Sequence, residues 1–116
     1  MSATLYGISN CDTVKKARRW LDQHAVEYRF HDLRKDGITA RQIQQWLDGQ
    51  GLERVLNKRG TTWRQLPQEV QNSVAPANAA ALLEQHPTLI KRPVLEYRDQ
   101  TRVGFKPADY EALFLS

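Results

Sequence analysis

The two ends of the chain carry strand patterns. Residues 3–8 form a short apolar run, typical of a buried strand, and residues 26–31 alternate between apolar and polar positions. Between them, apolar residues recur at helical spacing and predict a helix over 12–24, for which Ser9, Asn10 or Asp12 is the candidate cap. Strand, helix and strand in this order predict a parallel, right-handed unit.

The middle of the chain shows only helical periodicity. Thr39 is placed to cap a helix that Gly49 and Gly51 end, and shorter helical stretches follow at 52–56, 63–70 and 77–85. The last part returns to strands, with residues 94–97 and 101–105 forming a predicted hairpin. A final helix opens at Pro107. The element order predicts an α/β protein with a helical middle.

Size and composition set the class. The chain has 116 residues, which fits one domain, and no apolar run approaches the roughly 20 residues that a membrane span needs. Residues 1–6 lack the basic and apolar regions of a signal peptide. The single cysteine excludes an internal disulfide and favours a reducing compartment, so we expect a cytoplasmic protein.

The net charge of +4 is mild. The basic residues group at 15–19, 58–59 and 91–92, which is typical of a solvated surface and disfavours nucleic acid as a partner. Attraction for a small anionic substrate explains them equally well. Three scattered histidines (His24, His31 and His86) and one cysteine give no ligand spacing for a metal. We expect structural roles for all three histidines, with His24 packing on the inner face of the first helix.

Cys11 is the strongest candidate for chemistry. It follows a strand at the first turn of a helix, where unpaired amides and the helix dipole favour the nucleophilic thiolate. The alternative is a buried, inert cysteine. Val14 stands where a C-x-x-C motif has its resolving thiol, so a redox cycle needs a thiol from outside. Six residues separate Cys11 from Arg18 in a helical pattern, which disfavours a phosphatase-type loop.

Three segments together resemble the arsenate reductase-like (ArsC/Spx) family, and its YffB-type branch in particular. They cover residues 5–17, the stretch 86–94 (HPTLIKRPV) and residues 103–107. The resemblance implies a thioredoxin-like core, a mixed sheet flanked by helices, over 1–33 and 87–116. It also implies an all-helical insertion over 34–86 within a single domain. By the same resemblance, Pro93 is a cis-proline beside the active cysteine.

The resemblance also implies a site. Cys11 matches the nucleophile, while Arg92 and Lys106 match two of the basic residues that bind the oxyanion in this family. The third position falls on Asn57, with Arg59 as a nearby substitute. Glutathione is then the expected co-substrate, with glutathione itself or a glutaredoxin-like protein as the partner thiol, and no cofactor or metal is bound.

Two departures from the family pattern decide between its activities. Asp12 places a negative charge beside the thiolate and opposes a bound arsenate, and Lys106 does not reproduce the bidentate binding of an arginine. We therefore expect a glutathione-linked monothiol oxidoreductase. The alternatives are an arsenate reductase and an Spx-like regulator that binds RNA polymerase. The regulators use a C-x-x-C switch, which this chain lacks.

Overall fold

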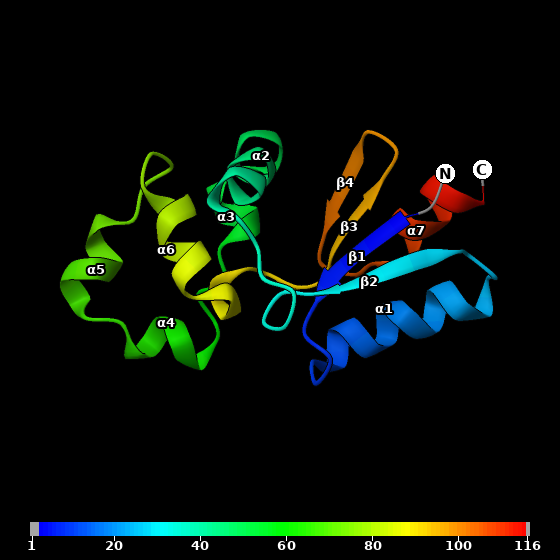
Figure 1. The fold of residues 1–116 in the computed structure, drawn as a ribbon, viewed down its shortest axis with the longest axis horizontal. Coiled ribbons are helices and arrows are strands. Elements are labelled where there is room, and N and C mark those ends of the chain that lie inside the picture. The colour runs from blue at the N-terminus through cyan, green and yellow to red at the C-terminus, as the bar shows by residue number, and fades with distance from the viewer. Residues whose placement is uncertain (1–2, 116) are drawn as a thin grey trace. The chain divides into compact units, whose positions relative to one another are not determined.

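The computed structural model describes residues 3–115, which form two compact units (Figure 1). Residues 3–37 and 92–115 make the first unit, which holds all four strands, and residues 38–91 make the second, which is helical. Within residues 3–115, no helix is both long and apolar enough to cross a membrane. The prediction that the two parts act as a single domain stays a prediction.

A mixed four-stranded sheet forms the centre of the first unit. Its order is β2-β1-β3-β4, with β1 parallel to β2 and the other two pairings antiparallel. The strands and their two helices are β1 (Ala3–Gly7), α1 (Asp12–Gln23), β2 (Tyr28–Asp32), β3 (Val94–Tyr97), β4 (Gln100–Val103) and α7 (Pro107–Phe114). The predicted parallel unit, hairpin and final helix are therefore confirmed.

Both helices of the first unit contribute to one hydrophobic core on one face of the sheet. This core joins inward-facing strand residues to residues of α1 and α7: Ala3, Leu5, Leu95, Ala17, Trp20, Leu21 and Tyr110. Because side chains alternate along a strand, Tyr6 and its register partner His31 lie on the opposite face. The core thus fixes where α1 begins relative to the end of β1.

Gly7 ends β1 at the point where α1 approaches the strand most closely. A Cβ atom at this position would lie 2.8 and 3.0 Å from the two γ-methyl groups of Val14, which is fully buried in α1. Neither the strand nor the helix has room to separate, because both belong to the packed core. A glycine is therefore required at position 7, because the Val14 side chain fills the space that a Cβ atom would occupy.

We predict that Gly7→Ala destabilises the protein by about 1–3 kcal/mol, the range for overpacking a filled core. Gly49→Ala is the matched control, because Gly49 lies in a helix with no atom within 4 Å of the added Cβ and alanine is the better helix former. Urea unfolding of the two variants measures the difference. Equal stabilities would show that the contact with Val14 does not constrain the fold.

The second unit contains only helices. They are α2 (Ala40–Gln50), α3 (Leu52–Val55), α4 (Thr61–Gln65), α5 (Gln68–Ser73), α6 (Ala79–Gln85) and the 3-10 helix η1 (Pro87–Leu89). The hydroxyl of Thr39 accepts a hydrogen bond from the Gln42 amide, so the predicted cap is confirmed. Ile43, Trp46 and Leu47 form the buried face of α2, as their spacing predicts.

The prediction of one helical stretch over 63–70 is wrong. The chain forms two short helices, α4 and α5, with an extended residue, Leu66 (φ −69°, ψ 142°), between them. Leu66 precedes Pro67, and the proline ring clashes with a helical conformation at the preceding residue. The local effect of proline therefore overrides the helical spacing of the flanking residues.

Candidate functional site

Cys11 is the N-cap residue of α1. Its backbone is extended (φ −94°, ψ 125°), and its carbonyl already accepts the first helical hydrogen bond, from the Lys15 amide at 3.0 Å. The Cys11 amide donates to the carbonyl of Ile8 at 3.2 Å, which closes the turn between β1 and α1. The cap expected from Ser9, Asn10 or Asp12 is therefore wrong: the cysteine itself holds that position.

The start of α1 has no side-chain cap. A serine, threonine or aspartate at the N-cap would satisfy one of the first free amides of the helix, whereas here a thiol occupies the place of the capping oxygen. Cys11 is a free cysteine, and the residue is partly exposed. The free amides and the dipole of a helix start favour an anion bound at such a place.

The strand register brings Pro93 to the same end of the sheet. Tyr6 pairs with Val94, so continuing this antiparallel register by one residue places Pro93 opposite Gly7. The carbonyl of Pro93 accepts a hydrogen bond from the Gly104 amide at 2.8 Å, which holds the chain after β4 at the same end of the sheet. The Arg92–Pro93 peptide bond is cis, which confirms that prediction.

Arg92 and Lys106 also lie at this end of the sheet. Arg92 is half-buried, with its Nε atom fully buried, and it immediately precedes Pro93. Lys106 is exposed and is the N-cap residue of α7. The first unit therefore gathers Cys11, Arg92, Pro93 and Lys106 at the end of the sheet where β1 and β4 finish and β3 begins. Arg59 belongs to the second unit, and its assignment to this site stays a prediction.

A polar group on the other face of the sheet was absent from the predicted site. The Tyr6 hydroxyl donates to Glu96 Oε1 at 2.9 Å, and the Tyr6 ring lies 4.8 Å from the His31 ring, centroid to centroid. Burial, together with the neighbouring Glu96, raises the pKa of Tyr6 to about 12, so the hydroxyl stays protonated. Alternation along each strand predicts the face on which Tyr6 or His31 lies, but only the strand register makes the two residues neighbours.

Asp32 is a buried acid at the end of β2, opposite Gly7 in the register. Its Oδ1 atom accepts hydrogen bonds from the amides of Arg34 (2.8 Å) and Lys35 (3.0 Å). These bonds, above all the one from Lys35, lower the pKa of Asp32. Asp32 therefore organises the turn that ends β2, a role that its position in an alternating strand did not reveal.

Because the pKa of Asp32 is lower in the folded than in the unfolded state, its charge stabilises the fold above about pH 4. That contribution is lost as the pH falls through the folded-state pKa. We predict that Asp32→Asn lowers stability by about 1–2 kcal/mol at pH 7 and by less at pH 3. Urea unfolding at both pH values measures this, with the exposed hairpin variant Asp99→Asn as control. An equal loss at both pH values would contradict the charge-based role.

Two further residues have structural contacts. Arg18 Nε donates to the Tyr28 hydroxyl at 3.1 Å and its guanidinium lies 4.2 Å above the Phe30 ring, so this arginine is engaged with β2. The expectation that His24 packs on the inner face is wrong: it is exposed at the end of α1, with its ring stacked 3.9 Å from that of Trp20. Across residues 3–115, no three His, Cys, Asp or Glu side chains group as metal ligands.

Comparison with known proteins identifies the family. The model of the ArsC family matches residues 6–113, nearly the whole chain. The chain belongs to the ArsC family. A solved structure, the YFFB protein, is 46% identical with a TM-score of 0.92, over 96% of this chain and 97% of that one. This ArsC-family protein therefore has the predicted thioredoxin-like α/β fold, a mixed sheet flanked by helices.

Curated relatives of the ArsC-family protein fall into two groups. An uncharacterized protein of Haemophilus influenzae is 43% identical and covers 96% of this chain and 97% of its own length. The global transcriptional regulator Spx of Streptococcus pneumoniae is 25% identical, over 94% of this chain and 83% of its own. The ArsC/Spx resemblance and the YffB-type branch are thus confirmed.

Proposed function

We propose that this ArsC-family protein is a monothiol oxidoreductase that uses Cys11 as its nucleophile and glutathione as its co-substrate. The observation that carries the proposal is the placement of a partly exposed thiol at an uncapped helix start. There the first amides of α1 stabilise the thiolate, which is the reactive form. The ArsC family model over residues 6–113 supports the same chemistry.

The reaction takes three exchange steps, of which the first two involve Cys11. In the first, the Cys11 thiolate attacks one sulfur of a substrate disulfide, and the other sulfur leaves as a thiolate. In the second, a glutathione thiolate attacks the sulfur that Cys11 had bound, which forms a glutathione mixed disulfide and returns the Cys11 thiolate. A second glutathione reduces that product and becomes oxidised glutathione, so two glutathione thiols supply the two electrons.

The basic residues at this end of the sheet suit glutathione as the co-substrate. Glutathione carries two carboxylates, and Arg92 and Lys106 are the cations that the first unit places at the end of the sheet with Cys11. Pro93 directly precedes β3 at the same end of the sheet. Its nitrogen carries no hydrogen, so it cannot donate a hydrogen bond. We assign these three residues, and Arg59 of the second unit, to substrate or glutathione binding.

We predict that oxidised glutathione adds one glutathione to each chain, at Cys11, and none to Cys11→Ser. The chain has a single cysteine, so intact mass spectrometry gives the stoichiometry without peptide mapping. Reductase activity with a small disulfide should also vanish in Cys11→Ser. No adduct on the folded wild-type protein, with full labelling after unfolding, would show a sealed sulfur and contradict the proposal.

Asp12 should lower the reactivity of Cys11, because Asp12 follows Cys11 directly and its carboxylate is exposed in the first turn of α1. We predict that Asp12→Asn raises the rate of alkylation by iodoacetamide at pH 7 roughly threefold, the effect of a charge about 7 Å away in water. Asp22→Asn removes the same charge near the other end of α1 and should change the rate by less than half as much. Equal effects would point to net charge alone.

A regulator that binds RNA polymerase is the second candidate, supported by the similarity to the Spx regulators. The two functions differ in their need for the thiol. Recovery of polymerase subunits with the Cys11→Ser variant as efficiently as with the wild type, together with no reductase activity in either, would favour the regulator.

Turnover of arsenate with glutathione and glutaredoxin would instead favour an arsenate reductase. A cytoplasmic location stays a prediction.

A further inference from the structure

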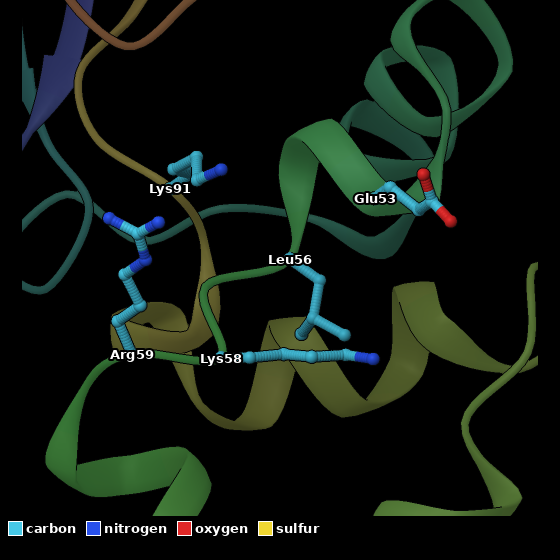
Figure 2. A pocket seen from close by; sticks show the side chains of 5 residues that line it. All are labelled: Glu53, Leu56, Lys58, Arg59 and Lys91. Carbon is cyan, nitrogen blue, oxygen red and sulfur yellow. The ribbon is translucent and has the colours of Figure 1, made fainter.

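The second unit contains a pocket of its own, with a volume of about 250 Å³ (Figure 2). Its lining consists of three cations, one acid and one apolar side chain: Lys58, Arg59, Lys91, Glu53 and Leu56. All five residues belong to the 38–91 unit, so the pocket is complete within it. Small-molecule sites of drug size occupy about 300–1,000 Å³, so this pocket suits a smaller ligand.

Backbone hydrogen bonds hold the cationic residues in place. Leu56 and Ile90 form an antiparallel bridge, extended by bonds from the Asn57 amide to the Leu89 carbonyl and from the Lys91 amide to the Val55 carbonyl, both at 2.7 Å. This bridge joins residues 34 positions apart and sets Lys91 beside the segment that carries Lys58 and Arg59. The pocket is therefore built by the fold of the unit.

The three cations have no anionic partner in the described part of the chain. None of the carboxylates in residues 3–115 forms an ion pair with Lys58, Arg59 or Lys91, and the Lys58 ammonium lies 5.3 Å from the centroid of the Trp63 ring. Gathering like charges around one pocket is unfavourable in the absence of a counter-charge. An anionic ligand would add negative charge that the lining lacks, since Glu53 is the one acid beside three cations.

The charges are divided between two ends of the pocket. In Figure 2 the head groups of Arg59 and Lys91 extend to one side of Leu56, and those of Lys58 and Glu53 extend to the other. The first end is purely cationic and suits a carboxylate, which arginine binds with two parallel hydrogen bonds. The second end, with one cation and one acid, suits an ammonium group and a carboxylate on the same carbon.

We propose that this pocket binds a free acidic amino acid of the size of glutamate. The distal carboxylate pairs with Arg59 and Lys91, the apolar stem lies against Leu56, and the amino acid head group pairs with Lys58 and Glu53. This ligand chemistry needs no thiol, and Arg59, assigned above to substrate or glutathione binding, is the one residue that the two proposals share. Glu53 distinguishes the site from a simple phosphate-binding patch, because it repels a group that carries only negative charge.

Titration of the ¹⁵N-labelled full chain, followed by NMR, tests the assignment. We expect L-glutamate to shift the amide signals of Lys58, Arg59 and Lys91. L-glutamine lacks the distal carboxylate and N-acetyl-L-glutamate lacks the ammonium, so each should bind about tenfold more weakly, the cost of one charge-assisted contact. γ-Glutamylglycine has its distal carboxyl group bound as an amide, so we expect it to bind more weakly than L-glutamate, and tighter binding would contradict the assignment.

Charge-removing variants provide the matched control. Arg59→Gln and Lys91→Gln should each weaken glutamate binding about tenfold, while Arg41→Gln, which removes an exposed charge elsewhere in the same unit, should change it less than twofold. Cys11→Ser should bind as the wild type does, which separates this test from that of the thiol reaction. Equal binding of phosphate and glutamate, or equal effects of Arg41→Gln and Arg59→Gln, would overturn the proposal.

Discussion

The close contact between the end of β1 and the first turns of α1 is the constraint on which the site depends. Gly7 leaves room for Val14, so the helix lies against the strand and the intervening turn must be short. The hydrogen bond from the Cys11 amide to Ile8 closes that turn and fixes the thiol at the N-cap. The core packing of the first unit therefore determines the chemical environment of the sulfur.

Opposing electrostatic effects meet at the start of α1. The helix dipole and the uncapped amides favour an anion at this place, while the carboxylate of Asp12 disfavours one. Arg18, about two turns further along α1, donates to the Tyr28 hydroxyl and lies over the Phe30 ring. Arg92 and Lys106 are the basic residues that the end of the sheet adds to this part of the first unit.

Local patterns predicted the local features well. The helical spacing of Val14, Ala17 and Leu21 gave the buried face of α1, and Thr39 marked the cap of α2. The errors have local causes as well, since Pro67 splits one expected helix and the end of α1 turns His24 to solvent. The pocket in the second unit lay beyond prediction, because the Leu56–Ile90 bridge that forms it joins distant residues and leaves no periodic signal.

The residue that shapes the site also limits its chemistry. Val14 stands three positions after Cys11, where a C-x-x-C protein has its resolving thiol, and here it is fully buried against Gly7. The methyl groups that fill this space hold α1 on the strand, so the position serves packing. Any thiol that resolves a mixed disulfide must then approach Cys11 from its exposed side. We infer that dependence on an external thiol follows from the packing of the helix on the strand.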